Sequence, residues 1–278
     1  MRIPNATYRL QFTPSFGFHS AMEMVNYLSL LGISDIYASP IFKARRGSPH
    51  GYDVVDATRI NPELGTEEDF ELLLEAVKLS SMGWLQDIVP NHMAYSRENM
   101  LLMDILENGE NSRYAHYFDI VWDHPYESLK GRVLAPFLGK SYGESLEEGE
   151  IQLAYDETGL SIQYYDLAFP LSIESYGDVL SIGLNRLKKS MGEDHPDFIK
   201  LLGILYVLKT LPSVEEIEDR HAQIRFIKRI FWELFSQSST IREFLKENIA
   251  SFNGVRGNAE TFGRLDALLS RQSFRLSF

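Results

Sequence analysis

Residues 84–92 read Trp-Leu-Gln-Asp-Ile-Val-Pro-Asn-His, an apolar run that passes directly into polar residues. Residues 84–89 predict a strand, since short runs rich in apolar and β-branched residues favour extended, buried backbone. Residues 7–12 and 33–38 predict two earlier strands, and a helical pattern separates each strand from the next. Connections of this length join parallel strands. The first hundred residues therefore predict an α/β fold with a parallel sheet.

Both helices between these strands have a start signal. Ser20 and Glu23 have the spacing of a capping box, in which two side chains satisfy free backbone N–H groups at a helix start. Thr66 and Asp69 open the second helix, and residues 39–65 before it predict a long loop rich in Gly, Pro and His. Later in the chain, residues 213 and 216 repeat the capping-box spacing as Ser and Glu, ahead of a long helical pattern.

The pattern changes after about residue 100. Short β-like runs occupy residues 118–122, 151–155 and 160–165, and from residue 175 onward the pattern is nearly all helical. The simplest organisation is the N-terminal part of a (β/α)₈ TIM barrel, with its first three strands in residues 1–100. A large, mostly helical insertion would follow the third strand over residues 101–272, with a small β part at about 118–170. Residues 273–278 would begin the return to the barrel.

Composition and charge exclude several functional classes. The 278 residues carry a formal net charge of −12, which argues against a nucleic-acid partner because phosphate backbones select surplus Lys and Arg. The chain has no cysteine, so it has no disulfide framework and no thiolate metal site. The longest apolar run, residues 201–208, is far shorter than a membrane span, and residues 1–12 lack the apolar core of a signal peptide. We expect a cytoplasmic protein with neither membrane nor nucleic-acid partners.

The candidate functional residues lie where the predicted strands end, because (β/α)₈ barrels build their sites at the carboxyl ends of the strands. Asp87 ends the third strand, and an aspartate there is costly to bury without partners, so we expect it to line a polar mouth. His92 could reach the same cavity. The alternative is a polar cluster that only terminates the strand. Arg9 and Gln11, at the end of the first strand, are further pocket candidates.

The tetrapeptide His50-Gly51-Tyr52-Asp53 follows the second strand. Sugar rings present apolar C–H faces that pack on aromatic rings, and their hydroxyls need donors and acceptors around the rim. Tyr52 beside His50 and Asp53 offers that combination, although the loop could equally pack on the barrel rim. The sequence has no glycine-rich phosphate loop and no Gly-x-Ser-x-Gly elbow, and its histidines lack ligand spacing. We therefore expect neither a metal nor another cofactor.

Several motifs together carry a family resemblance. Residues 87–92, Asp-Ile-Val-Pro-Asn-His, resemble the first signature region of glycoside hydrolase family 13, the α-amylase clan, written D-x-V-x-N-H. Residues 7–12 (Thr-Tyr-Arg-Leu-Gln-Phe), 37–42 (Tyr-Ala-Ser-Pro-Ile-Phe) and 47–56 (Gly-Ser-Pro-His-Gly-Tyr-Asp-Val-Val-Asp) narrow the resemblance to the maltooligosyltrehalose synthase family. Residues 61–65 and 268–276 continue it, so that the resemblance covers essentially the whole chain.

The resemblance implies roles for individual residues. Tyr52 matches the aromatic residue that stacks on the glucose at the cleavage subsite, and His50 matches a neighbouring sugar-binding histidine. Asp87 matches the aspartate that organises the catalytic pocket, and His92 the histidine that hydrogen-bonds the same glucose. The resemblance makes Arg9, Gln11 and Asp53 additional pocket residues.

The resemblance also implies a reaction. The family converts the reducing-end α-1,4 link of a maltooligosaccharide or a glycogen-derived α-1,4-glucan into the α,α-1,1 link of trehalose, with maltooligosyltrehalose trehalohydrolase as pathway partner. The nucleophile and general acid are expected beyond Phe278, so the 278-residue polypeptide alone is expected to show no turnover. The alternatives are an α-amylase or a 4-α-glucanotransferase of the same clan, or a non-catalytic glycan-binding remnant.

Overall fold

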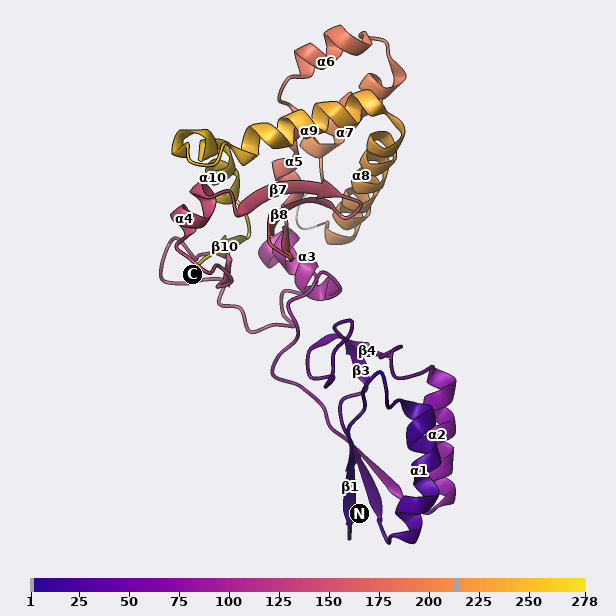
Figure 1. Ribbon diagram of the computed structural model, residues 1–278. Coiled ribbons are helices and arrows are strands. Elements are labelled where there is room, and N and C mark those ends of the chain that lie inside the picture. Colours follow the sequence, from indigo (N-terminus) through magenta and orange to yellow (C-terminus); the bar gives the residue numbers. More distant parts are fainter. Residues whose placement is uncertain (1–2, 213–215) are drawn as a thin grey trace. The chain divides into compact units, whose positions relative to one another are not determined.

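The structure is a computed structural model that describes residues 3–212 and 216–278. The chain divides into two compact units, the first ending at Met100 and the second beginning at Leu101. We call them unit 1 and unit 2 and describe each by itself (Figure 1).

Unit 1 alternates strands and helices in the order that the sequence predicts. Its elements are β1 (Thr7–Leu10), α1 (Phe18–Leu30), β2 (Asp35–Ala38), β3 (Phe42–Ala44), β4 (Val54–Ile60), α2 (Glu67–Leu79) and β5 (Gly83–Gln86).

The sheet of unit 1 has the strand order β1-β2-β5, and both pairings are parallel, as predicted. In the register, Arg9 lies opposite Tyr37, which lies opposite Leu85. The strands are shorter than predicted, since β1 ends at Leu10 and β5 at Gln86. The polar residues that follow each strand therefore emerge from the carboxyl edge of the sheet.

One face of this sheet is covered by α1 and α2 (Figure 1). Apolar side chains from all three strands and both helices form the core, because alternation along a strand sends every second side chain toward the helices. The fully or almost fully buried members include Phe12, Phe18, Leu28, Ile36, Ala38 and Leu73. Side chains that point to the opposite face of the sheet stay partly exposed to solvent, with Tyr37 36% and Leu85 40% exposed.

The two helices of unit 1 differ in whether the predicted start signal forms a cap. At α2, Thr66 Oγ1 accepts from the Asp69 N–H (3.1 Å) and the Asp69 carboxylate accepts from the Thr66 N–H (2.8 Å), so the capping box forms. At α1 the prediction from Ser20 is wrong, because the helix begins at Phe18 after Gly17 and has no side-chain cap. The Phe18 side chain is fully buried in the core and its N–H donates to the Leu64 carbonyl (2.8 Å), so tertiary contacts hold the start of this helix.

The predicted loop over residues 39–65 contains an antiparallel hairpin. Strands β3 and β4 pair with irregular register between Phe42 and Ala44. The prediction missed it because β3 has only three residues and β4 carries the polar run Asp56-Ala57-Thr58-Arg59, which resembles a turn.

Unit 2 combines two small sheets with a set of helices. Its elements are α3 (Met100–Asn108, starting at the boundary), η1 (Gly109–Asn111), β6 (Val133–Ala135), α4 (Tyr142–Glu147), β7 (Ile151–Asp156), β8 (Gly159–Tyr164), β9 (Leu167–Pro170), η2 (Ile173–Ser175), α5 (Tyr176–Leu180), α6 (Leu184–Met191), α7 (Pro196–Lys209), α8 (Ile217–Gln237), α9 (Ser239–Asn253), η3 (Ala259–Phe262), α10 (Gly263–Leu269) and β10 (Phe274–Leu276).

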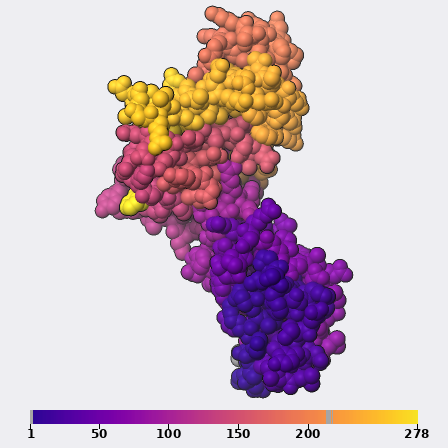
Figure 2. All heavy atoms as spheres, viewed as in Figure 1, coloured from indigo at the N-terminus to yellow at the C-terminus, as the bar shows by residue number. Residues whose placement is uncertain are grey.

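Strands β7, β8 and β9 form an antiparallel sheet. The predicted runs at 151–155 and 160–165 correspond to β7 and β8, whereas β9 was not predicted. The run at 118–122 forms no strand in the described chain. The Ile120 N–H donates to the Phe118 carbonyl (2.9 Å), two residues earlier, so the backbone turns there, and Val121 is 65% exposed. With all heavy atoms drawn, this unit has a continuous surface over its helices and strands (Figure 2).

Strand β10 pairs in parallel with β6 inside unit 2. The prediction that residues 273–278 begin a return to the barrel stays a prediction. The capping box proposed at Ser213 falls outside the described residues, while Glu216 precedes α8 without a side-chain cap. Within the described chain, no helix is long and apolar enough to span a bilayer.

Candidate functional site

Hydrogen bonds tie together the strand ends of unit 1. The Asp87 N–H donates to the Ala38 carbonyl (2.9 Å), and the Ser39 N–H donates to the Leu10 carbonyl (3.0 Å). The Ser39 hydroxyl is fully buried and accepts from the Phe12 N–H (2.8 Å). These contacts fix the residues that follow β1, β2 and β5 relative to one another.

Sequence reasoning did not single out Ser39 as a site residue. The sequence feature that could have indicated it is a hydroxyl directly after the apolar strand of residues 33–38. A polar side chain buried at such a position needs a hydrogen-bond partner.

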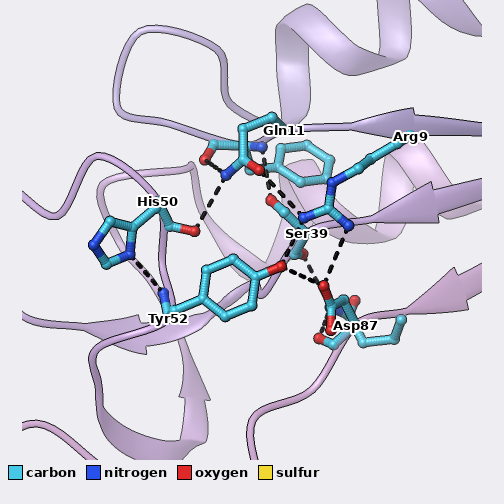
Figure 3. A network of polar contacts seen from close by, with 8 residues as sticks. Arg9, Gln11, Ser39, His50, Tyr52 and Asp87 are labelled. Carbon is cyan, nitrogen blue, oxygen red and sulfur yellow. Dashed lines mark hydrogen bonds and ion pairs between the residues drawn. The ribbon is translucent and has the colours of Figure 1, made fainter.

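Arg9, Tyr52 and Asp87 form the centre of the site (Figure 3). The Tyr52 hydroxyl donates to Oδ2 of Asp87 (2.5 Å) and accepts from Nη2 of Arg9 (2.7 Å). Nη1 of Arg9 lies 3.2 Å from the same Asp87 oxygen. The Arg9 guanidinium also lies over the ring of Tyr37, its neighbour in the sheet, 4.7 Å from the ring centroid. The guanidinium, the phenol hydroxyl and the carboxylate thus hold one another in place.

The pKa values follow from these contacts. The pKa of the Asp87 carboxyl lies below its usual value, chiefly because Tyr52 donates to it and then because Arg9 and Tyr37 stabilise its charge, against partial desolvation. The pKa of the Tyr52 phenol is raised, first because Asp87 holds its proton. Desolvation would lower the pKa of Arg9, but hydrogen bonds to Tyr52 and Asp87 outweigh it. At neutral pH the site therefore contains a carboxylate, a neutral phenol and a guanidinium.

Gln11 connects this centre to the loop after β3. Its side-chain amide donates to the His50 carbonyl (3.2 Å), and its oxygen accepts from Arg9 (3.3 Å). The Tyr52 N–H donates to Nδ1 of His50 (3.0 Å), so the neutral imidazole carries its proton on Nε2. The His50 side chain is 51% exposed, and its ring points away from Arg9 (Figure 3). It presents an N–H donor at the rim of the site.

Gly51 and Asp53 set the path of the loop after β3. Gly51 has φ +78°, and a Cβ added there would lie 2.8 Å from the Pro40 carbonyl oxygen, so only glycine fits without movement. Asp53 accepts a hydrogen bond from the Ser48 hydroxyl and lies 3.8 Å from His50 Nδ1. Asp53 therefore supports the loop more directly than it faces the Arg9–Asp87 pair.

His92 differs from the other predicted residues. Its side chain is exposed, and it makes no hydrogen bond or ion pair with the described residues. Arg9, Gln11, His50, Tyr52, Asp53 and Asp87 are linked by the contacts above. That His92 converges with Tyr52 and Asp87 on one cavity stays a prediction.

The connected residues offer a specific chemistry. The Arg9–Asp87 pair adds no net charge, and around it lie an aromatic ring, an amide, a hydroxyl and an exposed imidazole N–H. Such a set suits a neutral ligand with both apolar and hydroxyl-bearing surfaces. Within residues 3–212 and 216–278, no group of three or more potential ligand side chains could hold a metal ion.

Comparison with known proteins gives consistent matches. The family model described as "Alpha amylase, catalytic domain" matches residues 19–169, more than half of the chain. A putative maltooligosyl trehalose synthase of Mycobacterium tuberculosis is 40% identical over 141 residues, which is 48% of this chain and 18% of that protein.

Two solved structures are similar as well. A glycosyltrehalose synthase is 27% identical with a TM-score of 0.57, covering 98% of this chain and 26% of that one. A hypothetical maltooligosyl trehalose synthase of Sulfolobus tokodaii is 35% identical with a TM-score of 0.53, covering 70% of this chain and 24% of that one. The chain thus aligns with about a fifth to a quarter of the length of these relatives.

Proposed function

Because this chain belongs to the α-amylase catalytic-domain family, we propose that unit 1 contributes the saccharide-binding part of a glycan-active enzyme. The observation that carries the proposal is the Arg9–Tyr52–Asp87 network at the carboxyl edge of a parallel sheet. In (β/α)₈ barrels that edge is where sites are built. The parallel order β1-β2-β5 supports reading these strands as the first three of such a barrel, with unit 2 as an insertion after the third.

Within this proposal each side chain binds one part of a glucose ring. Tyr52 supplies an aromatic face for the C–H face of the ring, and the hydrogen bonds to Asp87 and Arg9 fix the phenol. The rim His50 offers its Nε2–H to a hydroxyl. Gln11 holds the loop that carries both residues, and Asp53 supports that loop from the other side. We include His92 as a further hydroxyl donor.

Asp87 is proposed as an organising residue rather than as nucleophile or general acid. A general acid must be protonated at the working pH, whereas the pKa of Asp87 is lowered by its donors. Its Oδ2 already accepts from both Tyr52 and Arg9, so that oxygen is poorly placed to attack an anomeric carbon. Its role is to fix the phenol and to accept from a sugar hydroxyl.

The reaction that the similarities support best is intramolecular transglucosylation of a maltooligosaccharide or glycogen-derived α-1,4-glucan. The reducing-end α-1,4 link would be exchanged for an α,α-1,1 link, as in retaining glycosidases. One carboxylate would attack the anomeric carbon to form a covalent glycosyl-enzyme, while a protonated carboxyl group about 5–5.5 Å away gives its proton to the departing oxygen. The released glucose would then attack through its anomeric hydroxyl, which requires water to be kept out. The product would be consumed by a trehalohydrolase that cleaves beside the new trehalose unit. A cytoplasmic location fits this pathway.

Hydrolysis or 4-α-glucan transfer is the second candidate, since the matching family is that of the α-amylases. It would use the same proposed glucose contacts and would differ only in the acceptor of the glucosyl intermediate. A non-catalytic glycan-binding role would need the contacts alone.

Binding of maltohexaose to the 278-residue chain, observed by saturation-transfer NMR, tests the site. We expect transfer to the sugar protons, much weaker in Tyr52→Ala than in the wild type and unchanged in Tyr27→Ala, a matched change at an exposed tyrosine of α1. Equal signals for the two variants, or no transfer at all, would overturn the proposed site.

The reaction itself is tested in a polypeptide that joins these residues to the catalytic carboxylates. Maltohexaose should lose its reducing ends without an equal release of glucose. New reducing ends would indicate hydrolysis, and glucans of altered length would indicate 4-α-glucan transfer.

A further inference from the structure

Unit 2 has a polar cavity of about 410 Å³ that is open to solvent on one side. Its walls come from the end of α3 with η1, from the turn before β6, from η2 with the start of α8, and from the turn before β10. The volume falls in the range of roughly 300–1,000 Å³ that small-molecule sites occupy. All lining residues belong to unit 2, so the cavity is separate from the network around Tyr52.

Three arginines form a fixed part of the wall. Arg220 is 11% exposed and is held by an ion pair with Glu174 and by a hydrogen bond to the Pro212 carbonyl (3.1 Å). Nη2 of Arg132 donates to the Ser270 carbonyl (2.7 Å). Arg271 pairs with Asp178, outside the cavity lining, at 2.8 Å. Each guanidinium group therefore already has at least one acceptor within unit 2.

Other polar groups remain available. Oε1 of Glu107 pairs with Lys228 Nζ (2.5 Å), Oε2 makes no hydrogen bond within the described chain, and the Glu107 side chain is 12% exposed. Asn111 is exposed and makes no side-chain hydrogen bond with the described residues. Arg132 uses only Nη2, which leaves Nη1 and Nε as donors. An acceptor, an amide and a pair of donors thus line one cavity.

The charge of the lining selects the class of ligand. Lys130, Arg132, Arg220 and Arg271 are opposed by Glu107, Glu110 and Glu174, so the lining has only one surplus positive charge. The lining offers both donors and acceptors, and a hydroxyl group can donate and accept at once. A phosphate would meet carboxylates, and a cation would meet guanidinium groups.

We propose that this cavity binds a neutral polyhydroxyl ligand of saccharide type, about a disaccharide in size. The lining contains no aromatic residue, so recognition depends on hydrogen bonds rather than on ring stacking. Glu107 accepts from one hydroxyl, Arg132 donates to another, and the Asn111 amide does both. The site does not depend on the proposed function of unit 1.

Calorimetric titration of the 278-residue chain carrying Tyr52→Ala, which removes the proposed sugar site of unit 1, with maltose and with trehalose tests the proposal. We expect one of these disaccharides to bind at millimolar concentration, and Asn111→Ala and Glu107→Gln each to weaken it about tenfold, the effect of one lost hydrogen bond. Asn185→Ala, an exposed asparagine of α6 outside the cavity, is the matched control and should leave affinity unchanged. If Glu107→Gln also disturbs the contact with Lys228, Asn111→Ala still tests the site, because Asn111 makes no side-chain hydrogen bond with the described residues.

A second comparison separates the two units. Tyr52→Ala should remove maltohexaose binding by unit 1 and leave the disaccharide affinity of unit 2 unchanged. No binding of either disaccharide, or disaccharide binding that Asn111→Ala leaves intact, overturns the proposal. So does tighter binding of inorganic phosphate than of either sugar, because the cavity would then be an anion site.

Discussion

The Tyr52 hydroxyl donates its hydrogen bond to Asp87, a residue 35 positions later in the sequence. The tyrosine belongs to the loop after β3, the aspartate directly follows β5, and Arg9 from β1 contacts both. Because three separate segments supply the partners, a change in any one should affect the other two.

Removing only the Tyr52 hydroxyl separates its hydrogen bonds to Asp87 and Arg9 from the proposed stacking of its ring on the sugar. Tyr52→Phe keeps the ring but leaves Asp87 and Arg9 each without one partner, so the free energy of unfolding should fall by about 0.5–1.5 kcal/mol. Maltohexaose affinity should fall only slightly, whereas Tyr52→Ala should lower it by about tenfold or more because the aromatic face is lost. Urea unfolding and calorimetric titration measure the two effects. Equal affinities for the Phe and Ala variants would argue against ring stacking.

The lowered pKa of Asp87 predicts a pH dependence of stability. A carboxyl whose folded-state pKa is depressed stabilises the fold above its unfolded pKa, about 3.9, and loses that contribution as pH falls through the folded value. The difference in free energy of unfolding between the wild type and Asp87→Asn should therefore be constant from pH 7 to pH 5. It should shrink below about pH 4.

Urea unfolding of both proteins across this pH range checks the prediction. Taking the difference cancels the titration of the other carboxylates. A difference that grows as the solution is acidified would contradict the lowered pKa.

Gly51 and Gly47 form a matched pair in the same loop. Both have positive φ, +78° and +73°, but a Cβ at Gly51 would meet the Pro40 carbonyl oxygen at 2.8 Å, while nothing lies within 4 Å at Gly47. Gly47→Ala should cost about 1–2 kcal/mol from backbone strain alone. Gly51→Ala should cost more and should also weaken maltohexaose binding, since His50 and Tyr52 flank it. Thermal unfolding compares the two, and equal losses would show that the close approach to Pro40 has no effect.

Thr66 and Ser20, the two residues predicted to open helices in unit 1, give a further matched pair of variants. Thr66→Ala should destabilise the protein by about 1 kcal/mol, because its hydroxyl accepts from the Asp69 N–H at the start of α2. Ser20→Ala should cost nothing measurable, since Ser20 lies inside α1 and caps nothing, and alanine favours helix. Both changes are read from chemical denaturation midpoints. A larger loss at Ser20 would mean that α1 begins later than Phe18.

The predictable part of the site was the set of residues at the strand ends. Asp87 and Arg9 could be predicted because apolar runs locate the strands, and parallel strands bring their carboxyl ends to one edge. Tyr52 and His50 came from the family motif in residues 47–56. The buried Ser39 was missed, as was the hairpin β3–β4, because a three-residue strand carries no periodic signal.

The sequence by itself determined the α/β alternation of unit 1, the parallel direction of its strands and the residue types at their ends, since these depend on local periodicity and connection length. Only the tertiary structure decided that Tyr52 pairs with Asp87 and Arg9, that Gln11 holds His50 by its carbonyl, and that α1 starts at Phe18. Those outcomes depend on side-chain distances between segments far apart in the chain, and on a core position that outweighs a local capping signal.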